Sequence, residues 1–536
     1  MVSFRLLFLA LLACNSALLA APPELMQNLD GDLSFTGKTP QESRENLQRL
    51  IDDIANGPAT TLMWSIGAGS DILYYQTKVA STWGWRQTKY NDDPKWQARI
   101  ERCRLATEAG LDAPRIVGER ARERGLKFFP SYRMNDAHYC SDPLHYPLTG
   151  RFWMEHQDAT IGESPIEGYD GYRHLLNYAD KEVRAYRLAV IFEAMDRYAD
   201  LMDGFELDFN RFQVFFPPGT AEKNAHLITA MLEKVRQHLN TIASEQKRPM
   251  QLIVRVPPAV KNCTWSGLEV STWMKQDLID AIIPAQVMTL SHDMPLDEFA
   301  ELARAAKPAK SKACEVIGSL YGRTGYNWPF SADHTTAAYS SEVSRTPTSA
   351  QFLGAALNQR SLGVTRHQIY NYILHTDSTT CEALTRLDGE RRYQITQAYF
   401  HDKEDSYEYR KQLPLALHPD KTASLRILIG ENPTQVNAYL RIGLQGANRD
   451  YADVAMNVTL NGRVLHEGST AKQLVVTTGT RHGNGSHAPP TEAYVQWPIS
   501  DPTLLRRGWN DIEISLTASA KALQLVETEI AIIEAE

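Results

Sequence analysis

The alternation in residues 203–211 constrains the fold of this chain more than any other segment. Apolar and polar side chains alternate in Asp203-Gly204-Phe205-Glu206-Leu207-Asp208-Phe209-Asn210-Arg211. Successive side chains of a strand point to opposite faces, so Phe205, Leu207 and Phe209 share one face, and Glu206 and Asp208 share the other. Because helical patterns precede and follow this segment, it is typical of a parallel α/β fold whose polar strand face points into a barrel.

Seven further segments have strand composition, and helical patterns lie between many of them. The eight predicted strands are Thr60–Gly67, Leu126–Tyr132, His174–Tyr178, 203–210, Gln251–Pro257, Ala281–Met288, Glu315–Tyr321 and Gln368–Leu374. Eight strands over roughly 350 residues match a (β/α)8 TIM barrel with inserted loops. We expect a helix over Asp388–Phe400 to close this α/β barrel.

The pattern changes near residue 411, where helical periodicity stops and short alternating segments follow. Turn signals such as Asn461-Gly462 separate these segments, which predicts a C-terminal antiparallel β-sandwich domain. The predicted organisation is therefore a signal peptide at 1–21, a barrel at 22–410 and a β-sandwich at 411–536.

The N-terminus predicts export. A short start that ends in Arg5 is followed by an apolar run from Leu6 to Ala21, as in a secretory signal. The run is too short for a membrane span, and no other segment is long and apolar enough. Cleavage near Ala20 or Ala21 would give a secreted or periplasmic protein. The alternative is cleavage before Cys14, which would leave a membrane-anchored lipoprotein with a lipid anchor at Cys14.

Composition and short motifs indicate which kinds of partner and cofactor this chain is not expected to bind. The net charge of −8 and the pI near 6.0 give no basic excess for nucleic acid. No Gly-rich phosphate loop, nucleophile elbow or CxxC pair occurs, so we expect no cofactor and no metal. Of the five cysteines beyond the signal, we expect one or two disulfides and a free thiol.

The active site of such a barrel lies at the C-terminal ends of its strands. The residues at these ends carry carboxylates, amides, guanidinium groups and aromatic rings, which suits a polyhydroxylated substrate. The candidates for substrate binding are Trp64, Arg133, Asn135, His138, Asn210, Arg211, Arg255, Tyr321, Tyr370 and Asn371. We therefore expect a carbohydrate partner.

The catalytic candidates are Asp208, Glu206 and Asp136. A glycosidase needs one protonated and one ionised carboxyl group, and two carboxyls this close on one strand should titrate apart. We predict Asp208 as nucleophile or base, with Glu206 as the first candidate for the acid and Asp136 as the second. Arg133 and Arg255, if near, would keep the other carboxyl ionised.

The 203–210 segment resembles the fourth strand of family 18 chitinases, which carry Asp-Gly-x-Asp-x-Asp-x-Glu. The final Glu, the proton donor of that family, is Asn210 here. The Gly-Phe-x-x-Asp arrangement also resembles amylase-type barrels, and this implies that Asp208 is the nucleophile. Those enzymes have Arg where this chain has Glu206.

The wider pattern resembles uncharacterised glycosyl-hydrolase-like barrels of secreted bacterial proteins. It comprises Arg133–Asp136, Asn177–Arg184 and Asp203–Asp208. The phrases Leu460-Asn461-Gly462 and Arg507–Ile512 resemble the galactose-binding-like sandwiches of secreted glycosidases. Sugar binding and a purely structural role are both open for that domain.

Two functions compete, and a third has less support. The first is a secreted glycoside hydrolase acting on an oligo- or polysaccharide. The alternative is a non-catalytic carbohydrate-binding protein on a hydrolase-like barrel, which Asn210 in place of the acid favours. A metal-assisted enzyme using Glu206, Asp208 and His138 is the third, although these residues lack a recognisable ligand spacing.

Overall fold

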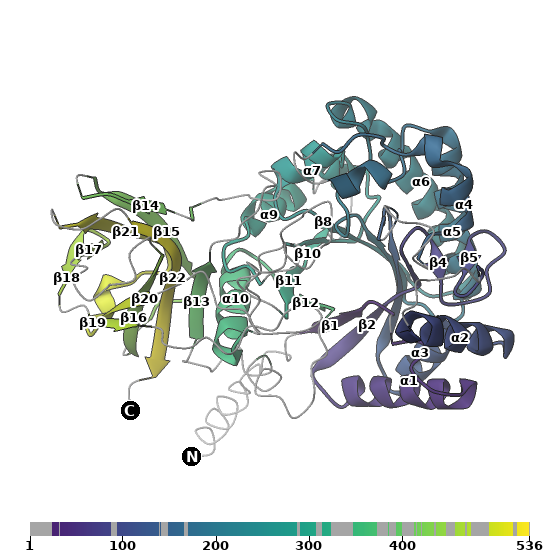
Figure 1. The fold of residues 1–536 in the computed structure, drawn as a ribbon, viewed down its shortest axis with the longest axis horizontal. Coiled ribbons are helices and arrows are strands. Elements are labelled where there is room, and N and C mark those ends of the chain that lie inside the picture. Colours follow the sequence, from purple (N-terminus) through teal and green to yellow (C-terminus); the bar gives the residue numbers. More distant parts are fainter. Residues whose placement is uncertain are drawn as a thin grey trace, which may run out of the picture.

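The computed structural model has two parts, a barrel surrounded by helices and an all-β part beside it (Figure 1). It describes residues 24–31, 33–86, 94–138, 140, 148–165, 170–286, 290–306, 313–322, 347–371, 384, 393–398, 412–413, 415–419, 421–433, 436–445, 456–466, 469–472, 493–517 and 523–534. The predicted signal segment and Cys14 lie outside the described residues.

Parallel strands form a closed ring. In ring order these are β1 (Leu25–Leu29), β2 (Ala59–Ser65), β6 (Lys127–Arg133), β7 (Gly204–Asp208), β8 (Gln251–Val256), β9 (Ala281–Pro284), β10 (Glu315–Val316) with β11 (Gly318–Tyr321), and β12 (His367–Tyr370). Only Ile317 separates β10 from β11. Since β10 pairs with β9 while β11 pairs with β12, the two together occupy one position and close the ring. The predicted (β/α)8 barrel is confirmed.

Two strand predictions need correction. The first barrel strand, β1, was not predicted, and it lies between β12 and β2. The predicted strand His174–Tyr178 is not one, because residues 170–174 form a 3-10 helix and Leu176 makes only an isolated bridge to Thr160. Since one strand is gained and one is lost before it, β7 is still the fourth barrel strand along the chain.

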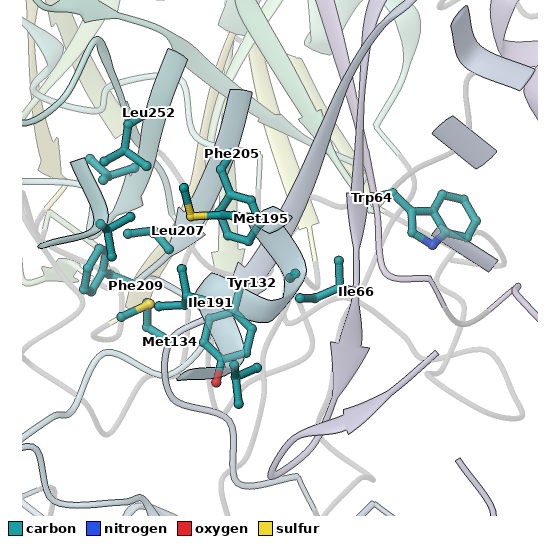
Figure 2. Packing of buried hydrophobic residues seen from close by; sticks show 14 of the residues in the cluster. Trp64, Ile66, Tyr132, Met134, Ile191, Met195, Phe205, Leu207, Phe209 and Leu252 are labelled. Atoms are coloured by element: carbon teal, nitrogen blue, oxygen red, sulfur yellow. The ribbon is translucent and has the colours of Figure 1, made fainter. Parts of the chain in front are cut away.

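The alternation of β7 acts as predicted. Phe205, Leu207 and Phe209 are buried in the core between sheet and helices, and Figure 2 shows them beside Ile191 and Met195 of helix α5 (Lys181–Arg197). Burying each such side chain contributes about 1.5–3 kcal/mol, so this face holds the strand against the helix. Glu206 and Asp208 consequently face the barrel interior.

The interior changes from apolar to polar along the strands. A separate buried apolar cluster lies inside the barrel. It consists of Met26, Met63, Phe129, Ile253, Ala281, Ile283 and Ile317. On several strands the next inward residues, two positions later, are polar, as in Met26 to Asn28 and Ile253 to Arg255. The polar groups therefore collect toward the C-terminal ends of the strands.

Helices surround the barrel (Figure 1). Their bounds are α1 (Pro40–Ala55), α2 (Pro94–Glu108), α3 (Ala113–Glu123), α4 (Arg151–Glu155), α5, α6 (Ala221–Gln246), α7 (Val260–Ser266), α8 (Val270–Lys275), α9 (Leu296–Ala305) and α10 (Ser349–Ser361). Asp180 caps α5 as predicted, its carboxylate accepting from the backbone N–H of Glu182 at 2.6 Å. None of the helices described is apolar over the length that a bilayer requires.

Short strands and unpaired thiols complete the barrel part. Strands β3 (Gly67–Ala68), β4 (Ile72–Leu73) and β5 (Ser81–Thr82) form a small sheet in the loop after β2. Cys140, Cys263 and Cys314 are free thiols, so the expected disulfides do not form at these three positions. They lie on separate segments of the barrel, and burial raises the pKa of the Cys140 thiol to about 12.

The C-terminal part is the predicted antiparallel sandwich. Its strands are β13 (Tyr393–Ala398), β14 (Leu415–Leu417), β15 (Ala423–Ile429), β16 (Val436–Gln445), β17 (Met456–Leu460), β18 (Arg463–Leu465), β19 (Ser469–Lys472), β20 (Ala493–Ile499), β21 (Gly508–Leu516) and β22 (Leu523–Glu534). One sheet has the order β13-β22-β16-β20-β19 with β14 also on β22, and the other has the order β15-β21-β17-β18.

The predicted closing helix over Asp388–Phe400 is wrong. Residues 393–398 form β13, which pairs antiparallel with β22, because a partner more than a hundred residues away overrides the local pattern. A segment before residue 411 therefore belongs to the C-terminal sheet.

The two parts share a hydrophobic core. Phe352 and Leu357 of α10 belong to the same buried cluster as Leu425 and Ile427 of β15. The side-chain amide of Asn358 donates to the backbone carbonyl of Leu428 at 2.9 Å. In Figure 1, α10 and β13 lie where barrel and sandwich meet.

Candidate active site

The site centres on a buried ion pair at the ends of β7 and β8. Asp208 and Arg255 are register partners on these neighbouring parallel strands. The Nη1 of Arg255 donates to Oδ1 and Oδ2 of Asp208 at 3.1 and 3.2 Å, and the backbone N–H of Asn210 donates to Oδ1 at 2.8 Å. Only 2% of Asp208 and 1% of Arg255 are exposed, so each charge depends on the other for compensation.

Glu206 lies one inward position earlier on the same strand and is fully buried. The side-chain amides of Asn28 and Gln368 each donate to one of its carboxyl oxygens at 2.8 Å. Burial and the nearby Asp208 raise the pKa of Glu206 to about 7. Near neutral pH this carboxyl group therefore exchanges between its protonated and ionised forms.

Arg133, on β6, links three other elements. It contacts the carboxylate of Asp30 just beyond β1, that of Asp136 at 3.2 Å, and the hydroxyl of Tyr370 at 3.4 Å. The guanidinium of Arg255 lies 3.7 Å from the centre of the Tyr370 ring. Tyr370 is thus held between two arginines. Arg255 makes a cation–π contact with the face of its ring, and Arg133 donates a hydrogen bond to its hydroxyl.

Asp136, His138 and Arg211 form a chain of hydrogen bonds. His138 Nδ1 lies 2.5 Å from Asp136 Oδ1, and Nη2 of Arg211 lies 2.5 Å from His138 Nε2. A guanidinium only donates, so Nε2 accepts and Nδ1–H donates, which makes the ring neutral. Burial together with Arg211 holds the pKa of His138 below its usual value, although Asp136 opposes them.

The predicted role of Asp136 as an acid does not fit. Burial acts to raise the pKa of Asp136, but His138 and Arg133 outweigh it and bring the pKa below its usual value. A carboxyl group that stays ionised has no proton to donate at neutral pH.

Trp64 is another correction, because its side chain lies outside the barrel. It is fully buried in the core between sheet and helices, and Figure 2 shows it on the outer side of the strands. Met63, its neighbour, points inward instead. The strand register therefore places Trp64 away from the barrel interior, and it does not line the site as the candidate for substrate binding that we expected.

Asn135 braces a loop and does not face the mouth of the barrel. Its amide nitrogen donates to the carbonyls of Leu176 and Val214, and its oxygen accepts from the backbone N–H of Leu176. Both atoms of its amide are thus bonded to the backbone of other segments, so Asn135 has a structural role here and does not line the site as expected.

Asn210 is also enclosed. Its amide nitrogen donates to the carbonyl of Ala285 at 2.7 Å, and its oxygen accepts from the amide of Gln213 at 2.9 Å. It is fully buried, so it joins β7 to β9 and offers nothing to a substrate.

The remaining predicted residues lie around the ion pairs. The Tyr321 ring stacks with that of Tyr370 at a centroid distance of 6.0 Å. The exposed Asn371 follows β12, and its amide donates to Asp30 Oδ2 at 2.8 Å. The structure thus brings eight of the predicted substrate-binding and catalytic side chains together near Glu206, and Tyr321 lies beside them. The eight are Arg133, Asp136, His138, Asp208, Arg211, Arg255, Tyr370 and Asn371.

Sequence reasoning missed Asn28, Asp30 and Gln368. The first two belong to or follow β1, which was not predicted, although Met26, Asn28 and Asp30 alternate as β7 does. Gln368 precedes Tyr370 by two residues, so the same alternation places it inward. Within the described segments, no group of three or more His, Cys, Asp or Glu residues is arranged to hold a metal ion.

No protein-family model and no curated protein matches this chain. Among solved structures, a cell-surface-expressed multi-modular chitinase from Paenibacillus sp. str. FPU-7 matches with TM-score 0.40 and 10% identity, covering 96% of this chain and 55% of its own. A cycloisomaltooligosaccharide glucanotransferase from Paenibacillus sp. matches with TM-score 0.34 and 10% identity, covering 94% and 57%. A class V chitinase from Pseudomonas fluorescens Pf-5 matches with TM-score 0.35 and 12% identity, covering 68% and 98%.

This chain spans 55% and 57% of the length of the two Paenibacillus proteins. At TM-scores below 0.5 these matches add nothing to the assignment of the fold, which rests on the strand pairing described above.

Proposed function

We propose that this chain is an exported glycoside hydrolase that cleaves an oligo- or polysaccharide, with Asp208 as the carboxylate that faces the reacting sugar. One observation carries the proposal. Asp208 ends the fourth strand of a (β/α)8 barrel, is held by Arg255, and lies two residues after a carboxyl group whose pKa is about 7. A buried pair of this kind is costly to maintain, and barrels use the C-terminal ends of their strands for chemistry.

In this proposal Asp208 is the nucleophile or base. Its negative charge stabilises the oxocarbenium-like transition state, and Arg255 keeps the carboxylate oriented. Glu206 has the pKa of an acid but no exposed surface, since Asn28 and Gln368 enclose it. We therefore assign Glu206 to holding a proton beside Asp208, as a positioning residue that limits the negative charge around it. The proton that the departing glycosidic oxygen takes up then comes from water in the mouth of the barrel.

A second candidate is a carbohydrate-binding protein without catalysis. The specific observation in its favour concerns the proton donor. Among the carboxyl groups described around the mouth, the one with a raised pKa, Glu206, is buried. The residue at the family 18 donor position, Asn210, is buried, and both its amide nitrogen and its amide oxygen are hydrogen-bonded within the protein.

Turnover of aryl glycosides and of oligosaccharides by the wild type and by Asp208→Asn tests the proposal. The wild type should hydrolyse at least one substrate, and the variant should lose several orders of magnitude in kcat while remaining folded. Asp71→Asn is a matched control, because Asp71 pairs with Arg187 in an equally buried ion pair outside the barrel. This control should lose stability but keep activity.

Two other results have clear meanings. Near-wild-type turnover by folded Asp208→Asn would contradict the catalytic assignment. Binding of an oligosaccharide by the wild type with no turnover would move the binding protein ahead.

A further inference from the structure

Four carboxyl groups lie around the mouth of the barrel, and they differ in exposure. Asp30 is 19% exposed at its side chain, Asp136 is 1%, Asp208 is 2%, and Glu206 is fully buried. A ligand that enters from solvent therefore reaches Asp30 more readily than the others. This aspartate directly follows β1, which lies three positions around the ring from β7.

The backbone holds Asp30 in one place. The next residue, Gly31, has a φ of +70°, and a Cβ there would lie 2.5 Å from the carbonyl oxygen of Ser65 and 2.8 Å from the ring of Tyr74. Only glycine fits both the conformation and the space. The chain therefore turns directly after Asp30 against the end of β2, which positions the carboxylate before any ligand arrives.

A second element approaches Asp30 from the other side. Asn371 has a φ of +50°, and its backbone N–H donates to the carbonyl of Asn28 at 2.9 Å. This bond anchors the left-handed residue to β1, so that its side-chain amide meets Asp30 Oδ2 at 2.8 Å. A non-glycine residue held in this conformation is strained, and such positions cluster at ligand sites.

The Asp30 carboxylate stays ionised and can still accept hydrogen bonds from a ligand. Burial acts to raise its pKa, yet Arg133 and Arg211 outweigh it and lower the pKa. Arg133 contacts one oxygen and Asn371 the other. Because each carboxylate oxygen offers about two acceptor positions, one on each oxygen remains for a ligand.

We propose that Asp30 and Asn371 form a subsite that binds two neighbouring hydroxyl groups of a neutral pyranose ring. A carboxylate accepts from a pair of adjacent hydroxyls in strong, charge-assisted hydrogen bonds, and the amide of Asn371 adds a polar partner beside it. Arg133 and Arg255 are already engaged by Asp30, Asp136 and Asp208, and the negative charge of Asp30 repels a second carboxylate, which together favour an uncharged sugar over an acidic one. The subsite rests on the proposed function, since it positions the sugar for Asp208.

Binding measurements test the subsite separately from the proposed catalytic function. In the Asp208→Asn background, which prevents turnover, calorimetry would measure the affinity for maltotetraose, cellotetraose, chitotetraose and xylotetraose. Adding Asp30→Asn should weaken the binding of whichever tetrasaccharide the parent binds by about 10- to 100-fold, the loss expected for a charged hydrogen bond. In the otherwise wild-type chain the same change should raise KM more than it lowers kcat.

Asn371→Gly is a second test of the subsite that should not disturb folding. Residue 371 is exposed, and glycine accepts its positive φ, so this variant should keep the thermal stability of its parent and still bind several-fold more weakly.

Three results would overturn the subsite. If Asp30→Asn binds as well as its parent, the subsite is wrong, while the proposed function stands if Asp208→Asn alone is inactive. Loss of kcat with unchanged binding would make Asp30 a reacting group instead. If the wild type binds and cleaves none of the four sugars, the proposed function and the subsite fail together.

Discussion

Arg255 meets Asp208 across two neighbouring strands with a single nitrogen, which lies 3.1 and 3.2 Å from the two carboxylate oxygens. The same guanidinium covers the face of Tyr370 at 3.7 Å. Loss of either charge would leave the other buried without compensation, so stability and chemistry depend on the same contact.

Arg255→Met should destabilise the protein by about 3–5 kcal/mol, the usual cost of breaking a buried ion pair from one side. The double variant Arg255→Met with Asp208→Asn should recover part of this loss, because no charge is then left unpaired. Urea denaturation of the two single variants and the double variant measures the effect. Strictly additive losses would show that the two side chains are not coupled.

Glu206 should make stability depend on pH. Its pKa rises from 4.5 to about 7 in the folded state, and this difference corresponds to about 3 kcal/mol. Because the folded form binds the proton more tightly, the contribution is fully present below pH 4.5 and is lost as the pH rises through 7. Unfolding free energies of the wild type should therefore fall between pH 5 and pH 8.

Glu206→Gln should flatten this profile, since the amide does not titrate. Gln368 Oε1 accepts no hydrogen bond from the part of the chain that the structure describes, and it can accept from the new amide after a rotation. Glu301→Gln, an exposed position on α9, is the control and should behave as the wild type does. If the wild type and Glu206→Gln have parallel profiles, the raised pKa of Glu206 is contradicted.

Gly31→Ala should be more damaging than an ordinary glycine replacement. It combines a positive φ with contacts of 2.5 and 2.8 Å, whereas Gly125 has a φ of +80° and nothing within 4 Å of an added Cβ. Gly125→Ala should cost about 1 kcal/mol for conformation alone, and Gly31→Ala should cost clearly more. Thermal unfolding of both variants gives the comparison, and equal losses would mean that the turn after Asp30 relaxes easily.

A fragment that ends at residue 411 tests the expected domain boundary. That boundary predicts an independently folded barrel, but removing the sandwich uncovers Phe352 and Leu357 of α10, both buried in the shared cluster. We expect poor solubility and a lower unfolding temperature for the fragment. Co-expression of residues 22–391 with 392–536 should restore solubility, because β13 then stays with its sheet. A soluble, cooperatively unfolding fragment alone would support separate domains.

The sequence predicted the barrel and the inward face of β7 because a period of two is a local signal that burial enforces. It failed for β13, whose pairing with β22 joins segments far apart along the chain. The first strand was missed since Leu25–Leu29 mixes amides with apolar residues.

For the site, residue type at a strand end was a good guide where the strand register was correct. Asp208, Arg133 and Arg255, chosen in this way, lie together at one end of the barrel, and their roles stay predictions. The prediction for Trp64 failed because its neighbour Met63 is the residue that points into the barrel. The prediction for Asn210 failed because its amide donates to the carbonyl of Ala285, just beyond β9. Side-chain bonds of this kind depend on loops and neighbouring strands that no local pattern encodes.

The place of β22 within its sheet has a consequence for the order of folding. This strand, residues 523–534, pairs with β13, β14 and β16, which all precede it in the chain. Until β22 has been synthesised, β13 and β16 have open edges, and the cover over α10 is incomplete. The sheet and its packing on α10 should therefore be complete only after residues 523–534 have been synthesised, and before that point the chain should be most prone to aggregation.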